Sequence, residues 1–281
     1  MSPPAAEGKG KAEARGRAAE AREEAAESAA ARASRGVWEQ ISTLLVAVLI
    51  ALAIRAFVIE PYRIPSGSMF PTLLVGDHLF VNKFIYGIKL PFTTLRLPGL
   101  REPERGDIAV FTVAQRGSQT YPADRRPDLP REEFVKRIIG LPGDRISFRG
   151  GRVFVNGDPV EARPLGETFE DDTGSTLDVS EVKLGDRSFR ILDDPHVSIP
   201  SPVDTITVEP GRYFMLGDNR DHSKDSRFWG TVRLAEIKGP AFVLYWSWDF
   251  NGSWAELLNP LRLLDLLTSK TRWHRIGDGV K

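Results

Sequence analysis

Residues 64–73 read Ile-Pro-Ser-Gly-Ser-Met-Phe-Pro-Thr-Leu, and the rest of the chain is organised around this short stretch. Pro65 and Pro71 fix the backbone φ angle at two points and bias the residue before each toward extended conformations. Gly67 permits a backbone torsion that a side chain would forbid. The stretch therefore predicts a stiff, extended loop that holds the hydroxyls of Ser66 and Ser68 close together. By itself it also fits a proline-bounded turn whose serines bond only their own backbone.

The segment just before this loop is apolar enough to enter a membrane. Residues 37–60 form an almost unbroken apolar run, and about 20 helical residues span the hydrocarbon core of a bilayer. Arg55 lies near the end of the run, where its long side chain can reach the headgroups. Trp38 and Tyr62 lie where interfacial aromatic residues belong, and Pro61 closes the segment. We therefore expect one transmembrane helix at residues 37–60.

Charge bias sets the expected orientation of this helix. Arg32 and Arg35 flank its amino-terminal end, and basic residues favour the cytoplasmic side. Residues 1–36 are rich in alanine and charged residues and have no aromatic or branched aliphatic side chain, so we expect a disordered cytoplasmic tail. Residues 61–281 should then form an exported domain. Ser68 follows the span closely enough to work at the membrane surface, since one extended residue covers only about 3.3–3.6 Å.

A cleaved signal peptide is the competing interpretation of the apolar run. The pattern Ala-Leu-Ala at residues 51–53 is compatible with a cleavage site. However, the charged tail is longer than the apolar run, and the apolar character continues past Ala53 to Ile59. A buried core helix fits less well, because the run has no polar face.

Composition excludes several classes of function. The 281 residues include 38 lysine plus arginine and 38 aspartate plus glutamate, so no global basic field indicates nucleic-acid binding. The chain has no cysteine, which excludes disulfides, thiol nucleophiles and cysteine metal ligands. The four histidines, at positions 78, 196, 222 and 274, lack a metal-ligand spacing. We expect neither a metal nor a cofactor.

Short runs of β-branched and aromatic residues, separated by turns, follow the opening motif. The expected strands cover residues 77–83, 107–113, 134–139, 146–148 and 153–155. Arg-Gly-Gly-Arg at 149–152 predicts a hairpin turn, and Asn156-Gly157 predicts another. The sequence therefore predicts a mainly β fold: an antiparallel-sheet catalytic domain with an inserted β subdomain, preceded by one amino-terminal transmembrane helix.

The inserted subdomain is expected at about residues 160–210, which are more polar than their surroundings. Four acidic residues, at 167, 170, 171 and 172, gather there, and such a cluster usually marks a solvated face. Residues 241–250 return to dense apolar and aromatic character, and residues 256–267 fit a short amphipathic helix. Either segment could be core or a membrane-contacting surface.

A serine hydroxyl needs a base before it can act as a nucleophile, and two candidates are present. His222 lies in a polar loop that is rich in carboxylates, and the members of a Ser-His-Asp set can be far apart in sequence. Lys136 lies in an expected strand, where period-two geometry places it on the same face as Phe134 and Ile138. Apolar neighbours disfavour the charged ammonium and lower its pKa. The alternative is a lysine that extends to solvent at a strand edge.

A second serine and lysine pair has to be considered. Residues 180–183, Ser-Glu-Val-Lys, match the Ser-x-x-Lys spacing of penicillin-interacting enzymes. They lie in the polar insert, without a convincing following helix and without the accompanying Ser-Asp-Asn and Lys-Thr-Gly elements. We interpret this match as chance.

Four separate blocks together resemble the ordered motifs of bacterial type I signal peptidases. In order, they are residues 65–72 (Pro-Ser-Gly-Ser-Met-Phe-Pro-Thr), 105–108 (Arg-Gly-Asp-Ile), 136–144 (Lys-Arg leading into Gly-Leu-Pro-Gly-Asp) and 217–230 (the Gly-Asp-Asn-Arg loop through Phe-Trp-Gly). The resemblance extends from the membrane segment to residues 272–277 and leaves out the polar insert and the first 36 residues. Each block alone is a weak signal, but chance agreement of all four in order is very improbable.

The resemblance implies a Ser-Lys dyad. Ser68 matches the family's nucleophile and Lys136 its general base. Ser66 matches the side-chain donor of an oxyanion hole that also uses the Ser68 amide, and Ser223 matches the hydroxyl that orients the lysine. The resemblance also implies that Asp225 and Arg227 support the structure of the site. It further implies shallow pockets for small side chains, lined by Ile64, Met69, Leu73 and Val135.

These matches imply a membrane-anchored serine endopeptidase that removes signal peptides from exported precursors and cleaves after Ala-x-Ala-like sequences through an acyl-enzyme. The expected partners are such precursors and the lipid bilayer, with no nucleic acid and no metal. The implied location is the bacterial cytoplasmic membrane, single-pass, with the catalytic domain on the periplasmic side. The chain departs from the family's pattern in three ways: many relatives have two spans, some have cysteines, and His222 occupies a position that need not be histidine.

Two other classes of protein remain as alternatives. One is a non-catalytic, membrane-tethered peptide-binding protein that keeps the peptidase fold. The intact set of Ser68, Lys136, Ser66 and Ser223 argues against it. The other is a self-cleaving repressor, which also uses a Ser-Lys dyad but needs an amino-terminal DNA-binding domain. Residues 1–36 have no aromatic or branched aliphatic side chains from which to build its core.

Overall fold

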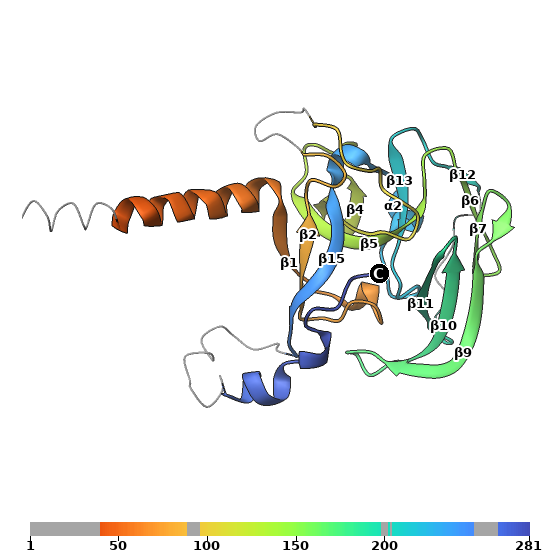
Figure 1. The fold of residues 1–281 in the computed structure, drawn as a ribbon. Coiled ribbons are helices and arrows are strands. Elements are labelled where there is room, and N and C mark those ends of the chain that lie inside the picture. Colours follow the sequence, from red (N-terminus) through yellow and green to blue (C-terminus); the bar gives the residue numbers. More distant parts are fainter. Residues whose placement is uncertain (1–39, 89–95, 198–201, 203, 250–263) are drawn as a thin grey trace, which may run out of the picture. The chain divides into compact units, whose positions relative to one another are not determined.

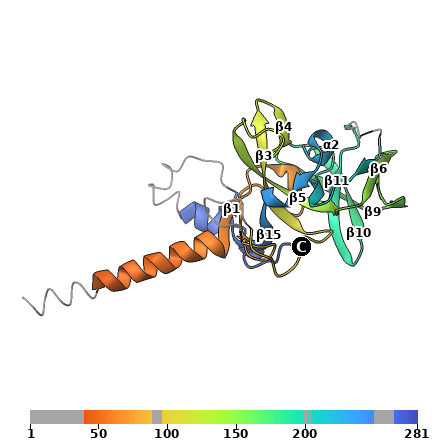
Figure 2. The same cartoon turned by 90° about the horizontal axis from the view of Figure 1, so that it is seen from above.

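The computed structural model describes residues 40–88, 96–197, 202, 204–249 and 264–281. The chain divides into two compact units, residues 1–55 and residues 56–281, drawn in two views in Figures 1 and 2. The tail expected at residues 1–36 lies outside the described residues. So does most of the amphipathic helix expected at 256–267.

One helix in the described chain is long and apolar enough to cross a membrane. It runs over Gln40–Phe57, and the apolar side chains along it are exposed to the surroundings. At 1.5 Å per residue, its 18 residues reach about 27 Å, close to the thickness of a hydrocarbon core. The sequence-based end at residue 60 is wrong by three residues, because Ile59 already begins a strand. Pro61 lies within that strand, which is tolerated because the strand is at a sheet edge.

An eight-stranded sheet forms the centre of the second unit. Its order is β1-β2-β15-β3-β5-β13-β14, with β4 paired to β3, and the recorded pairings are antiparallel. This confirms the mainly β, antiparallel fold. The strands are β1 (Ile59–Arg63), β2 (Asp77–Asn82), β3 (Ile108–Arg116), β4 (Gln119–Pro122), β5 (Arg131–Gly140), β13 (Arg212–Leu216), β14 (Val232–Arg233) and β15 (Ile237–Ser247).

The core of this unit is built from alternate residues of the same strands. One buried cluster contains Ile64, Met69 and Val135, and a second contains Phe111, Ile138 and Met215. Val135 and Ile138, on opposite faces of β5, thus pack into different clusters. This is the period-two pattern that the sequence predicted for this strand.

The insert is more extensive than the sequence indicated, and it is not simply a solvated ribbon. It contains two further sheets, ordered β11-β10-β9 and β12-β6-β7-β8, and the second begins at residue 145 rather than near 160. The predicted turns at 149–152 and 156–157 are present, with positive φ at Gly150, Gly151 and Asn156. The strands are β6 (Arg145–Arg149), β7 (Arg152–Val155), β8 (Asp158–Pro159), β9 (Glu161–Glu170), β10 (Thr176–Leu184), β11 (Arg187–Asp193) and β12 (Ile206–Thr207).

The insert has its own buried side chains, because one face of β10 is apolar. Val182 and Leu184 pack with Ile139 and Phe214 of the main sheet. Of the four clustered acidic residues only Asp171 is buried, so the expectation of a solvated face holds for three of them.

The Ser-x-x-Lys match of the insert lies within strand β10. Ser180 is buried there and Lys183 is exposed. Residues three apart on a strand face opposite sides. The two side chains therefore cannot act together, and the match is chance.

The remaining described elements are short. They are η1 (Gly67–Met69), α2 (Ser226–Trp229), η2 (Leu234–Glu236), η4 (Leu266–Lys270) and η5 (Trp273–Arg275). Element η1 corrects the expectation for the opening motif: the backbone is extended at Ser66, but Gly67 begins a single 3₁₀ turn that the Phe70 amide closes at 3.0 Å. The reason for glycine also differs, since a Cβ on Gly67 would lie 2.5 Å from the Phe70 ring. Space, rather than an unusual torsion, requires glycine here.

Candidate active site

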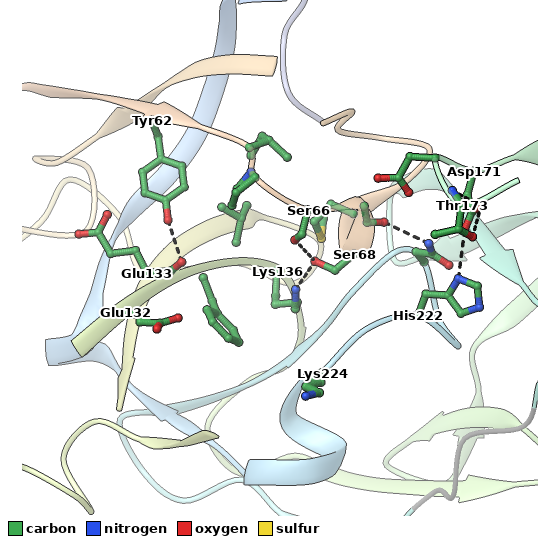
Figure 3. A pocket seen from close by; sticks show the side chains of 18 residues that line it. Tyr62, Ser66, Ser68, Glu132, Glu133, Lys136, Asp171, Thr173, His222 and Lys224 are labelled. Carbon is green, nitrogen blue, oxygen red and sulfur yellow. Dashed lines mark hydrogen bonds and ion pairs between the residues drawn. The ribbon is translucent and has the colours of Figure 1, made fainter. Parts of the chain in front are cut away.

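The fold brings the serine of the opening motif against the lysine of strand β5. Ser68 lies in turn η1, and Lys136 lies opposite Ala109 of β3. The Lys136 Nζ atom donates a hydrogen bond to Ser68 Oγ at 2.5 Å, and the Ser66 hydroxyl lies 3.5 Å from the same oxygen (Figure 3). The three residues that the sequence placed in one catalytic set are therefore neighbours.

Burial changes the acid–base character of the lysine. Lys136 is only 3% exposed, and this loss of hydration lowers the pKa of its ammonium to about 8. Asp225 and Asp218 oppose the shift, and Arg227 adds to it. The Phe134 ring lies 5.5 Å from Nζ, as expected for a residue two positions away on one strand face. A useful fraction of this amine is thus neutral near pH 7 to 8.

The loop at residues 217–227 supports the dyad through a buried ion pair. Arg227 donates from Nε and Nη2 to the two oxygens of Asp225, both at 2.8 Å. The carboxylate also accepts the backbone amides of Gly217 at 3.1 Å and of Arg227 at 3.2 Å, and so it caps helix α2. The two residues named from the resemblance form a bidentate pair within the loop.

Ser223 lies beside the nucleophile but does not make the expected contact. Its buried hydroxyl has no hydrogen-bond partner among the described residues, so the lysine-orienting bond is not formed here. A Cβ on Gly217 would lie 2.2 Å from Ser223 Oγ and 2.5 Å from the Ser68 carbonyl oxygen. The Ser223 hydroxyl and the Ser68 carbonyl thus both lie close to Gly217, where there is no room for a side chain.

An open groove of about 590 Å³ passes the dyad. Three of the four predicted pocket residues line it, namely Ile64, Met69 and Val135. Leu73 does not: it is 1% exposed and packs behind the groove in the core cluster. Its amide bonds the Met69 carbonyl at 3.0 Å, and this turn carries the side chain inward. The groove is lined by residues 62, 64–69, 132–136, 171–173, 219, 222 and 224.

Tyr62 and Asn219 line the groove and make hydrogen bonds across it, but they are not among the site residues predicted from the sequence. The Tyr62 hydroxyl donates to the Glu133 carbonyl oxygen at 2.8 Å and so joins the segment after the helix to strand β5. Asn219 donates from its side chain to the Gly67 carbonyl at 3.1 Å and from its backbone to the Ser68 carbonyl at 3.3 Å. Asn219 lies in residues 217–230, one of the four sequence blocks that resemble the family, and this position could have identified it as a site residue. Tyr62 was assigned only to the membrane interface.

A buried ion pair behind the dyad was also not anticipated. Arg137 donates to the two oxygens of Asp218 at 2.8 and 2.7 Å, and both side chains are 1% exposed. Thr72 donates to the same carboxylate at 2.6 Å, and the Arg137 guanidinium lies 3.8 Å from the Phe189 ring centroid. One carboxylate thus joins the nucleophile turn, the strand of the lysine and the polar loop.

His222, the alternative base, contacts carboxylates rather than the nucleophile. Its Nε2 lies 3.0 Å from Asp194 Oδ2, and its Nδ1 lies 3.3 Å from Asp171 Oδ2. Burial raises the pKa of Asp171, but hydrogen bonds from Thr173, Ser175 and His222 outweigh that effect and keep it below its usual value. The hydrogen bond to Ser68 Oγ belongs to Lys136, and this geometry favours the lysine.

In the part of the chain that the structure describes, no group of three or more His, Asp or Glu side chains is arranged to hold a metal ion. A serine that accepts a hydrogen bond from a buried amine of lowered pKa, beside an open groove, is the arrangement expected of a serine hydrolase.

Comparisons with known proteins identify the family. The model of the family described as signal peptidase, peptidase S26, matches residues 37–246. The signal peptidase I of Pseudomonas aeruginosa is 38% identical over 212 residues, covering 72% of this chain and 69% of that protein. The signal peptidase I of Aquifex aeolicus is 32% identical over 254 residues, covering 79% and 90%. A solved signal peptidase I of Enterococcus faecalis is 26% identical, with a TM-score of 0.29, and covers 50% of this chain and 97% of that one.

The chain belongs to the signal peptidase family, peptidase S26. It is a serine peptidase, a hydrolase of the family that removes signal peptides.

Proposed function

We propose that this protein is a membrane-anchored endopeptidase that removes amino-terminal signal peptides from exported precursors by means of a Ser68–Lys136 dyad. One observation carries the proposal: the buried Nζ of Lys136 lies 2.5 Å from Ser68 Oγ, at the floor of an open groove. A neutral amine at this distance can take the hydroxyl proton as the serine attacks. The lowered pKa of Lys136 supports the same step.

The reaction follows from these positions. Ser68 Oγ attacks the scissile carbonyl, and Lys136 accepts the proton and later delivers it to the leaving amine, so that an acyl-enzyme remains. The Ser68 amide and the Ser66 hydroxyl are the proposed donors to the developing oxyanion. Since the Ser66 hydroxyl now faces Ser68 Oγ at 3.5 Å, a rotation about its Cα–Cβ bond is needed. A water molecule, deprotonated by Lys136, then attacks the ester carbonyl, and Lys136 returns the proton to Ser68 Oγ as the bond from that oxygen to the acyl group breaks.

Ser223 is proposed to orient the lysine during this cycle. Its buried hydroxyl has no other partner in the described chain, so it is available to accept a bond from the amine when Ser68 is acylated. Asp225 and Arg227 are proposed to hold the loop that carries it.

Specificity for small residues is proposed to come from the apolar part of the groove. Ile64, Met69 and Val135 line that part with largely buried side chains, and the resemblance to the family implies shallow pockets there. Strand β13 pairs with β5 only from Arg137 onward, so no described strand pairs with residues 131–136 on that side, and an extended peptide could add there beside the Tyr62–Glu133 hydrogen bond. We expect small side chains one and three residues before the cut.

Orientation and location are proposed from charge bias. The basic tail is expected in the cytoplasm, Gln40–Phe57 is the proposed single span, and the catalytic domain is expected on the periplasmic side of the bacterial cytoplasmic membrane. The proposed partners are signal-peptide-bearing precursors and the lipid bilayer. In spheroplasts, added protease should digest the domain and spare an epitope in the tail; the opposite pattern would reverse the orientation.

The direct test is cleavage of a panel of precursors by the purified full-length protein in detergent. Precursors with Ala-x-Ala before the cut should be processed, and a bulky residue at either alanine position should abolish processing. A mechanism-based acylating probe should label the wild type and not Ser68→Ala. Binding of precursors without cleavage or labelling would instead support a non-catalytic peptide-binding protein. Equal cleavage of every precursor variant would contradict the proposed pockets.

A further inference from the structure

The groove has two chemically different ends, with the dyad between them. Tyr62 and Glu133 lie on one side of Ser68, and Asp171, Thr173 and His222 lie on the other (Figure 3). Apolar lining comes from residues 64, 69, 134 and 135; in the chain, residue 64 lies between Tyr62 and Ser68, and residues 134 and 135 lie between Glu133 and Lys136, so this lining extends from the dyad toward the first end. The second end is polar and is formed by residues 171–173 together with residues 219, 222 and 224.

The polar end is formed by two segments that are distant in sequence. The turn between β9 and β10 comes from the insert, and the loop at residues 217–227 comes from the catalytic sheet. Phe169, at the end of β9, packs on Phe70 of the nucleophile turn with ring centroids 5.4 Å apart. The insert therefore touches the catalytic turn and does not extend away from it.

Asp171 organises the turn of the insert. Its Oδ1 accepts the Thr173 amide at 2.9 Å, the Thr173 hydroxyl at 2.7 Å and the Ser175 amide at 2.9 Å. These bonds occupy one carboxylate oxygen and leave the other, Oδ2, facing the Nδ1 of His222 at 3.3 Å. The Asp171 side chain is 2% exposed. The turn and the histidine are thus joined through a buried carboxylate.

The second ring nitrogen of His222 extends the link to the other edge strand of the same sheet. Nε2 lies 3.0 Å from Asp194, directly after β11. The Asp194 amide bonds Asp221, the neighbour of His222, at 2.9 Å. An imidazole presents two nitrogens in divergent directions, so a single side chain contacts the residues that follow both edge strands, β9 and β11, at one end of this sheet. The loop that carries His222 also carries Asn219, which bonds the Ser68 carbonyl.

The direction of a bound precursor follows from the lining of the groove, and this step rests on the proposed function. The small residues before the cut occupy the apolar part, so the chain after the cut must leave through the polar end. The mature segments of different precursors share no apolar pattern to be recognised. A polar wall of fixed shape suits such segments, because it can bond their backbone without selecting side chains.

We propose that His222 is a positioning residue that holds the β9–β10 turn against the 217–227 loop, and that this turn forms the wall of the groove for the segment after the cut. His222 does not take part in proton transfer to Ser68. Its effect on the reaction passes through the position of residues 171–173. The insert therefore belongs to the substrate-binding part of the protein.

The test compares two substrates that are identical before the cut. One continues for eight residues after it, and the other ends there in a small ester leaving group. In the full-length protein in detergent, His222→Ala should lower kcat/KM for the long substrate at least about tenfold more than for the ester. A tenfold difference between the loss in kcat/KM for the long substrate and the loss for the ester is about the effect of one lost hydrogen bond to a charged group. His222→Gln, which can donate from only one nitrogen, should give an intermediate ratio.

A matched control and a second readout keep the proposal testable if activity is low. His274 is exposed in η5, and His274→Gln should leave both rates unchanged. Hydrogen exchange at the amides of residues 173–175 should accelerate in His222→Ala and stay at the wild-type rate in His274→Gln.

Several outcomes would overturn the proposal. Equal losses on both substrates would indicate a general structural role, and unchanged exchange at residues 173–175 would exclude the link to the turn. A wild-type protein that cleaves neither substrate would instead refute the proposed function, and the exchange measurement would still decide whether His222 holds the turn.

Discussion

Replacement of Lys136 by methionine should abolish turnover and, at neutral pH, make the protein more stable. The folded protein releases the Lys136 proton near pH 8, whereas an ordinary lysine releases it near 10.5. This difference of about 2.5 pKa units corresponds to about 3 kcal/mol, since each unit is about 1.4 kcal/mol. Below pH 8 both the folded and the unfolded chain carry the proton, and the folded state then bears the full cost of the buried ammonium.

The sign of the pH dependence follows from proton binding. Between pH 8 and 10.5 the unfolded chain holds the proton and the folded chain does not, so the stability of the wild type rises with pH across this window. Methionine has a similar length and no charge. Lys136→Met should therefore exceed the wild type in free energy of unfolding by about 1–3 kcal/mol at pH 7, after allowance for the lost bond to Ser68. The difference should shrink toward pH 10.

Urea unfolding of the full-length protein in detergent, followed by tryptophan fluorescence at pH 7 and pH 10, measures this difference. Lys183→Met, at an exposed position of β10, is the matched control and should show no pH-dependent gain. A Lys136→Met protein that is no more stable than the wild type at pH 7, or whose advantage grows with pH, would refute the account of Lys136 as a buried amine.

The same pKa value determines the pH profile of activity. The neutral fraction of Lys136 should be about one-tenth at pH 7, one-half at pH 8 and nine-tenths at pH 9, and kcat/KM should follow it. At pH 7 the neutral fraction of an amine with a pKa of 10.5 would be about 300-fold smaller than that of Lys136. A controlling group near pH 6.5 that disappeared in His222→Gln would restore the histidine as the base.

Three further predictions concern the dyad and its support. The double variant Ser68→Ala with Lys136→Met should be scarcely less active than either single variant, because members of a catalytic unit are not additive; an additive loss in single-turnover kinetics would contradict the dyad. Gly217→Ala should reduce turnover strongly, because its Cβ would lie 2.5 Å from the Ser68 carbonyl oxygen, whereas wild-type rates in the pre-steady state would mean that the turn can shift freely. Asp218→Asn should lower the free energy of unfolding by about 3–5 kcal/mol, the cost of leaving a buried partner charge unpaired; a loss below 1 kcal/mol in urea melts would show that Arg137 finds another partner.

The sequence predicted those parts of the structure that are encoded locally. Alternation of apolar residues located the strands, and Asn156-Gly157 with its neighbouring hairpin turn located two reversals of the chain. The placement of Lys136 among apolar neighbours followed from the period of a strand. Its contact with Ser68 could be expected only from the resemblance, because the two residues are 68 positions apart.

Features that depend on packing between distant segments could not be predicted. The Phe70 ring, and not a torsion, requires glycine at position 67, and nothing in the local sequence indicates where that ring lies. Leu73 faces the core because of a backbone bond within its own turn. The two carboxylates beside His222 come from the insert. The polar composition of the insert gave no indication that one face of β10 is apolar. For Gly67 and His222 a tertiary contact decided between interpretations that the local sequence left open, and for Leu73 the hydrogen bonding of its own turn did so.

The carboxylate of Asp218 joins Thr72 of the nucleophile turn to Arg137, the neighbour of the lysine on β5. Movement of the nucleophile turn would have to break the Thr72–Asp218 hydrogen bond, and movement of β5 would have to break the buried Arg137–Asp218 ion pair, before serine and lysine could separate. Separation of the dyad therefore costs buried polar contacts, and we expect it to be rarer than the opening of exposed loops. Warming should leave the active fraction of molecules equal to the folded fraction, so that the working lifetime of this protein is its unfolding lifetime.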